Sequence, residues 1–100
     1  MRAGGLSEPR KATSEIQEYV DRVKPTFEDG VNVSYSEFRA VAYRTQTVAG
    51  VNYFFSVATN NSSNEFIFLK IFKSLPSSGG ELSLTGYQTG KTASDEIIYF

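Results

Sequence analysis

The sequence contains no histidine and no cysteine among its 100 residues. Ser-His-Asp triads, Cys-His pairs and the usual zinc ligand sets all need one of these residues, so such catalytic and metal sites are excluded. The lack of cysteine also excludes a disulfide framework, which fits a reducing compartment. We therefore expect a protein that is not an enzyme and that binds no cofactor or metal.

Positive and negative side chains are nearly equal in number. Ten Lys and Arg residues stand against eleven Asp and Glu residues, for a net charge of −1. No basic field is present to attract phosphates, so we expect no nucleic-acid partner. Residues Met1 to Gly5 contain no apolar stretch of the length that a signal peptide or membrane helix requires. The sequence predicts a cytoplasmic protein with no membrane partner.

The apolar content is sufficient for a compact core. Hydrophobic residues make up 40% of the chain and aromatic residues 14%. A chain of this length buries about 60 to 70% of the surface that it exposes when unfolded. We expect one domain that spans residues 1–100.

An amphipathic helix is expected over residues 13–29. Either Thr13 or Ser14 caps its start, and Gly30 ends it. Pro25 removes one backbone donor inside the helix, so we expect a kink there or a loosely formed end. The helix presents one apolar stripe, which consists of Ile16, Tyr19, Val20, Val23 and Phe27.

A hairpin over residues 38–58 follows the helix. Its two arms are rich in β-branched and aromatic residues, which favour strands. A solvated hairpin tip normally carries Asn, Asp, Gly or Ser, so the apolar residues at this tip indicate a contact surface. The alternative is a loop packed against its own domain. The segment, which we call the first tip, is Gln46-Thr47-Val48-Ala49-Gly50.

Residues 65–100 are expected to form the remaining strands and a second turn, and the chain is expected to end in a strand at residues 97–100. The second turn, residues 74–80, contains Leu75-Pro76, which presents apolar surface in a preset conformation unless the leucine packs inward. Together with residues 38–58, these segments predict an α+β domain with one helix laid across an antiparallel sheet.

Alternation along the strands sorts their side chains into two faces. One face, expected beneath the helix, carries Tyr53, Phe55, Val57, Ile67, Leu69 and Ile71. The other face is expected to be uncovered and carries Phe54, Phe66 and Phe68. This aromatic stripe is either a partner site or oligomer contact, or a set of ordinary exposed aromatic residues.

Several motifs together resemble the type 1 cystatins, or stefins. The resemblance runs nearly end to end and rests on Gly4-Gly5, on the Gln-x-Val-x-Gly pattern from Gln46 to Gly50, on Leu75-Pro76 and on Leu84-Thr85-Gly86-Tyr87-Gln88-Thr89. It implies a cystatin-like α+β fold, in which one α-helix packs across a curved antiparallel β-sheet of four to five strands.

The resemblance also implies reversible, tight-binding, competitive inhibition of papain-like cysteine proteases, including cathepsins of the B, H, L and S class. In the family, the N-terminal trunk (here residues 1–10) and two turns form a wedge that occludes the active-site cleft. Carried over position by position, the protease-binding residues are Ala3, Gly4, Gly5, Gln46, Thr47, Val48, Ala49, Gly50, Leu75 and Pro76. Ala3 is smaller than the apolar residue that family members often carry there, which would weaken trunk-dependent binding.

Two alternatives stay open at this point. A cystatin fold can also serve as a non-inhibitory binding module or an engineered scaffold, because a fold alone does not fix function. A monomer is expected, but stefins are known to exchange hairpins between protomers, so a domain-swapped dimer that opens at Val48 is the second oligomeric state.

Overall fold

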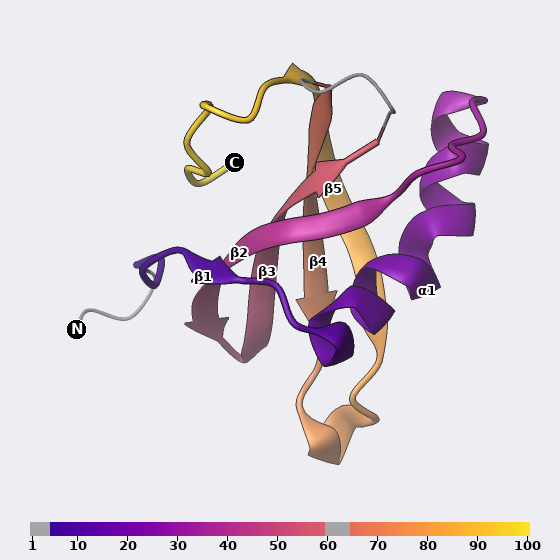
Figure 1. Ribbon diagram of the computed structural model, residues 1–100. Helices are drawn as coiled ribbons and strands as arrows, with labels where there is room; N and C mark the ends of the chain where they lie inside the picture. Colours follow the sequence, from indigo (N-terminus) through magenta and orange to yellow (C-terminus); the bar gives the residue numbers. More distant parts are fainter. Residues whose placement is uncertain (1–4, 60–64) are drawn as a thin grey trace.

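The structure, a computed structural model, describes residues 5–59 and 65–100. One helix lies across a five-stranded antiparallel sheet in which each strand pairs with the next along the chain (Figure 1). This arrangement confirms the predicted α+β class. The elements are β1 (Arg10–Lys11), α1 (Ser14–Val31), β2 (Arg39–Val48), β3 (Gly50–Ala58), β4 (Phe66–Lys73), the short 3-10 helix η1 (Pro76–Ser78) and β5 (Leu82–Lys91).

Helix α1 begins after Thr13, whose hydroxyl oxygen accepts a hydrogen bond from the Ile16 N–H at 3.3 Å. Thr13 rather than Ser14 is therefore the cap. The prediction that Gly30 ends the helix is wrong, because the helix continues to Val31 and Asn32 adopts the left-handed conformation with φ 58°. Asparagine tolerates this conformation, and its N–H donates to the Glu28 carbonyl.

Pro25 lies within α1 and does not end it. Proline removes the hydrogen bond to the carbonyl of the residue four positions earlier, at a cost of about 3 kcal/mol. Phe27 follows Pro25 on the apolar stripe and is buried. Burial of a large apolar side chain contributes about 1.5 to 3 kcal/mol, which offsets much of that cost and holds the last turns in place.

The apolar stripe of α1 packs on the predicted face of the sheet. One buried cluster joins Ile16, Val20, Val23 and Phe27 of the helix to Phe55, Val57, Ile67, Leu69 and Ile71 of the strands, and Tyr19 and Tyr53 pack at its margin. The alternation of side chains in β3 and β4 therefore predicted this face correctly.

The opposite face of the sheet is covered, so the prediction of an uncovered aromatic face is wrong. Phe54 and Phe68 are fully buried, and Phe66 is 9% exposed. The cover is the C-terminal segment, residues 92–100, which has no strand and turns back from the end of β5 (Figure 1). Its Ile97 is buried against Phe54 and Phe68, with Phe100 and Leu6 packed beside them.

The expected terminal strand at residues 97–100 is therefore also wrong. Alternation does not distinguish a strand from an extended segment that lies on a sheet, since both are apolar and β-branched or aromatic. Covering the rings of Phe54 and Phe68 removes apolar surface from water, which is the more stable arrangement.

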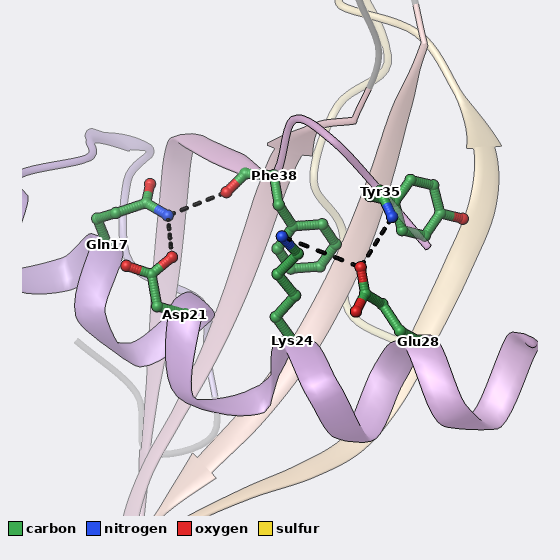
Figure 2. Close-up of polar contacts among 6 residues, drawn as sticks. All are labelled: Gln17, Asp21, Lys24, Glu28, Tyr35 and Phe38. Carbon is green, nitrogen blue, oxygen red and sulfur yellow. Dashed lines mark hydrogen bonds and ion pairs between the residues drawn. The ribbon is translucent and has the colours of Figure 1, made fainter. Parts of the chain in front are cut away.

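Polar side chains of α1 hold the connection that leads from the helix into β2 (Figure 2). Gln17 Nε2 donates to the Phe38 carbonyl at 3.0 Å and to Asp21 Oδ1 at 2.8 Å, and Gln17 Oε1 accepts from the Ala40 N–H at 2.8 Å. Further along the helix, Glu28 Oε2 accepts from the Tyr35 N–H at 2.8 Å. These bonds fix where β2 begins, and so fix the hairpin that carries the first tip.

Candidate functional site

The connection between the two strands at the first tip is shorter than the sequence indicates. β2 runs to Val48 and β3 begins at Gly50, which leaves Ala49 as the only residue between the strands. Residues 46–50 are expected to join the two strands, and this is wrong for all of them but Ala49: Gln46, Thr47 and Val48 belong to β2, and Gly50 belongs to β3. Thr47 and Val48 are β-branched and favour extended backbone, so they continue the ladder to the end of the hairpin.

The first tip presents its apolar side chains to solvent. Val48 is 42% exposed, and Thr47 and Ala49 are exposed beside it. Gln46 is instead buried, and its side-chain oxygen accepts a hydrogen bond from Asn52 Nδ2 at 2.9 Å across the hairpin. The alternative of a tip packed against its own domain is excluded. Gln46 therefore stabilises the hairpin through this hydrogen bond, and Thr47, Val48 and Ala49 form the exposed end of the hairpin.

The second turn also presents apolar surface. Leu75 is 44% exposed, which excludes the alternative in which it packs inward. Its carbonyl oxygen accepts hydrogen bonds from the N–H groups of Ser78 at 2.8 Å and Gly80 at 3.0 Å, so the turn is closed by its own backbone. Gly79 and Gly80 both have positive φ, which glycine adopts without steric cost. Pro76 begins η1.

Pairing between β3 and β4 brings the two turns to the same end of the sheet. Val51 of β3 lies opposite Lys73 of β4. The first tip ends just before Val51 and the second turn begins just after Lys73, so both turns lie at this end of the strand pair. Both connections lie at the lower edge of the sheet in Figure 1. Lys73 Nζ also donates to the Tyr19 hydroxyl at 2.8 Å, which ties the start of the second turn to α1.

The N-terminal trunk runs beside the first tip. Leu6 forms a β-bridge with Gln46, and the Ser7 N–H donates to the Thr45 carbonyl at 2.7 Å. The Ser7 hydroxyl oxygen accepts from the Thr45 N–H at 2.9 Å. Gly5 is exposed next to this anchor. Ala3 and Gly4, two of the predicted binding residues, lie outside the described residues.

Sequence reasoning missed several residues that position the site. The two-residue strand β1 pairs Arg10 and Lys11 with Tyr43 and Ala42, but a strand this short leaves no periodic pattern to detect. Asn52 and Ser7 act through hydrogen bonds across the chain, which no local pattern predicts. The run Asn60-Asn61-Ser62-Ser63-Asn64, whose composition predicts a turn, lies outside the described residues.

The chemistry of the site is that of a docking surface. Within residues 5–59 and 65–100, no group of acidic side chains is arranged to hold a metal ion. In the same ranges, no helix has both the length and the apolar character needed to cross a membrane. The surface instead presents exposed apolar side chains and backbone at the end of a rigid sheet.

Comparisons with known proteins agree with this fold. A family model described as a cystatin domain matches residues 4–94. The chain is 50% identical to human (Homo sapiens) cystatin-A and 48% identical to cystatin-A of Felis catus, each over 97 residues that cover 97% of both chains. It is 46% identical over 100 residues to leukocyte cysteine proteinase inhibitor 1 of Sus scrofa, covering 100% of this chain and 95% of that protein. The chain therefore belongs to the cystatin family, within which it is a type 1 cystatin, or stefin, close to stefin A.

Proposed function

We propose that this chain is a reversible, tight-binding, competitive inhibitor of papain-like cysteine proteases, with cathepsins of the B, H, L and S class as its targets. Membership of the cystatin family and the similarity to a protein named as a cysteine proteinase inhibitor support this function rather than an enzymatic one. The observation that carries the proposal is the meeting of three segments at one end of the sheet: the trunk, the first tip and the second turn.

In this proposal the three segments form a wedge that enters the active-site cleft. Residues Ala3, Gly4 and Gly5 of the trunk lie in the unprimed subsites. The first tip (residues 46–50) and Leu75-Pro76 fill the primed side. No segment presents a scissile carbonyl to the catalytic thiolate at attacking distance, so nothing is cut and binding is reversible.

The exposed apolar side chains suit binding in a cleft from which water must be displaced. Val48 and Leu75 are large apolar side chains exposed on the two turns, and burial against a protease would remove them from water. The β-ladder and the closed second turn already fix their backbone, so little conformational entropy is lost on binding. A rigid wedge of this kind binds more tightly than a flexible peptide with the same side chains.

The competing function is a non-inhibitory binding module or engineered scaffold. Such a protein has no reason to keep Val48 and Leu75 both exposed at the same end of the sheet, because exposed apolar tips favour aggregation. We further propose that the protein acts in the cytoplasm as a monomer. A second, domain-swapped peak on size-exclusion chromatography after heating would contradict the monomer.

The direct test is titration of active papain at nanomolar concentration with the purified chain, followed by hydrolysis of a small fluorogenic substrate. We expect stoichiometric loss of activity that is recovered on dilution and relieved by excess substrate. No inhibition by a folded monomer would overturn the proposed function and favour the scaffold.

A matched pair of valines tests whether the first tip makes the contact. Val48 is 42% exposed and Val33 is 47% exposed, but Val33 lines a hollow with Thr59 and Glu65 at the opposite end of β3. Val48→Asp should weaken papain binding by roughly a hundredfold, as expected when a buried interface anchor becomes a charge. Val33→Asp should leave binding unchanged. Equal effects of the two changes would exclude the first tip from the interface.

A further inference from the structure

We propose that Arg44 is a positioning residue of the wedge, because it fastens the trunk to the C-terminal segment and so fixes where the trunk leaves the sheet. The inference rests on the proposed inhibitory function, which it deepens. It assigns a part in binding to a residue in the middle of β2 and to a segment, residues 92–100, that lies outside the three segments of the wedge.

Arg44 reaches both ends of the chain with one side chain. Its Nε donates to the Ser7 carbonyl at 2.8 Å, and its Nη1 donates to the Ile97 carbonyl at 2.5 Å. The same Nη1 lies 3.7 Å from a carboxylate oxygen of Glu96. The Arg44 side chain is only 17% exposed, which lowers the screening of these charge-assisted bonds by water.

Only arginine supplies this geometry. The guanidinium is a planar fork with several N–H donors in fixed directions, so it can hold two carbonyl oxygens on different segments at once. Lysine carries its charge at a single nitrogen on a flexible stem and has no such fork. A lysine at position 44 would keep the charge but would not hold Ser7 and Ile97 in a fixed relation.

Apolar packing joins the same two segments. Leu6 of the trunk and Ile97 of the C-terminal segment belong to one cluster around Phe54 and Phe68. Lys70 holds the far end of the C-terminal segment, since its Nζ donates to the Phe100 main-chain oxygen at 3.1 Å and lies over the Phe54 ring. The trunk anchor is therefore built on the C-terminal segment as well as on β2.

This anchor lies directly after the part of the trunk that enters the cleft in the proposed complex. Residues 3–5 immediately precede Leu6 and Ser7. A change in the backbone direction at Ser7 therefore displaces every trunk residue of the proposed interface. A segment that must be ordered on binding loses affinity through conformational entropy. By fixing Ser7 in the free inhibitor, Arg44 removes part of that cost in advance.

The test is a double-mutant cycle in the full chain, in which Arg44→Lys is combined with Gly4→Glu, the change expected to block the trunk. The readout is the dissociation rate of the papain complex. Arg44→Lys alone should speed dissociation roughly three- to tenfold, the cost of ordering one or two residues. In the Gly4→Glu background it should have no further effect. The control is Arg39→Lys, because Arg39 is an exposed arginine on the same strand. It should leave the dissociation rate unchanged both alone and in the Gly4→Glu background.

Equal effects of Arg44→Lys in both backgrounds would overturn the proposal, because a merely structural arginine loosens the whole wedge. No effect in either background would overturn it as well, and so would a Gly4→Glu change that leaves the dissociation rate unaltered. Failure of the unsubstituted chain to inhibit papain would instead overturn the proposed function.

Amide hydrogen exchange tests the anchor without a protease and without altering Arg44. The Ser7 N–H donates to Thr45 and should be protected in the unsubstituted chain. Lys70→Met removes the contacts of the Lys70 ammonium group with Phe100, Phe54 and Tyr99, which all lie outside the trunk, and so loosens the C-terminal segment. It should increase the exchange rate at Ser7 severalfold while the Gln17 N–H, at the start of α1, stays as before. Unchanged exchange at Ser7 would overturn the coupling between the two segments.

Discussion

A Cβ atom on Gly50 would lie 2.6 Å from the carbonyl oxygen of Lys73, closer than real Cβ atoms come to any neighbour. It would also lie 2.8 Å from the Phe72 ring. Gly50 opens β3 at the first tip, and Lys73 closes β4 just before the second turn. The two turns of the proposed wedge are therefore fixed to each other through a backbone contact that only glycine allows.

Gly50→Ala should destabilise the fold by about 1 to 3 kcal/mol, since φ 125° is strained for alanine and the methyl group must displace the end of β4. Denaturant unfolding followed by circular dichroism measures the change. Gly30→Ala is the matched control, because Gly30 lies in α1 with nothing within 4 Å of its added Cβ. It should stabilise the protein by about 0.5 to 1 kcal/mol. Equal changes would show that the contact with Lys73 is irrelevant.

Leu75→Ala should raise the dissociation constant for papain about tenfold, because Leu75 is exposed in the free protein and would be buried in the proposed complex. The free energy of unfolding should change by less than about 0.5 kcal/mol, as for other surface substitutions. Val33→Ala removes apolar surface of similar exposure at the other end of the sheet and should alter neither quantity. A Leu75→Ala chain that binds papain as tightly as the unsubstituted chain would remove the second turn from the wedge.

Short-range patterns predicted much of this fold. The spacing of Ile16, Val20, Val23 and Phe27 identified the buried stripe of α1, and alternation in β3 and β4 identified the face beneath it. The exposed apolar residues Val48 and Leu75 were found because turn chemistry disfavours them at these positions. These features are local, so each can be found within a window of a few residues.

The largest differences from the sequence-based predictions are relationships between distant segments. Whether Phe54 is exposed depends on Ile97 and Phe100, which lie more than forty residues away along the chain. The role of Arg44 depends on the carbonyl groups of Ser7 and Ile97, and a carbonyl belongs to every residue type. No side-chain pattern encodes such contacts, so their identification requires the structure.

Phe54→Ala should destabilise the fold by about 3 to 5 kcal/mol, because Phe54 is fully buried beneath the C-terminal segment and its loss leaves a cavity. Thermal and denaturant unfolding measure the effect. Ile98→Ala is the control in the covering segment itself, where Ile98 is 56% exposed, and it should cost less than about 0.5 kcal/mol. A small cost for Phe54→Ala would mean that the C-terminal segment does not cover this face in solution.

The stability of the fold should fall above pH 10, and Tyr53 should account for part of the fall. Burial, followed by the nearby Tyr19, raises the pKa of the Tyr53 hydroxyl above its ordinary value of about 10. Between that value and the higher folded-state pKa, the folded protein holds a proton that the unfolded chain has lost. The unfolded state therefore binds fewer protons, and the free energy of unfolding decreases as the pH rises.

Tyr53→Phe removes this titrating group, so its free energy of unfolding should fall less steeply above pH 10 than that of the unsubstituted chain. Tyr35→Phe should act in the same direction, because burial and the charges of Glu65 and Glu28 raise the pKa of Tyr35. Urea unfolding followed by circular dichroism at intervals from pH 7 to pH 11 measures the slopes. Between pH 7 and pH 9 both substitutions should shift the curve by a constant amount, since tyrosine does not titrate there. A slope above pH 10 that is the same in all three proteins would mean that neither hydroxyl is shielded from water in the folded state.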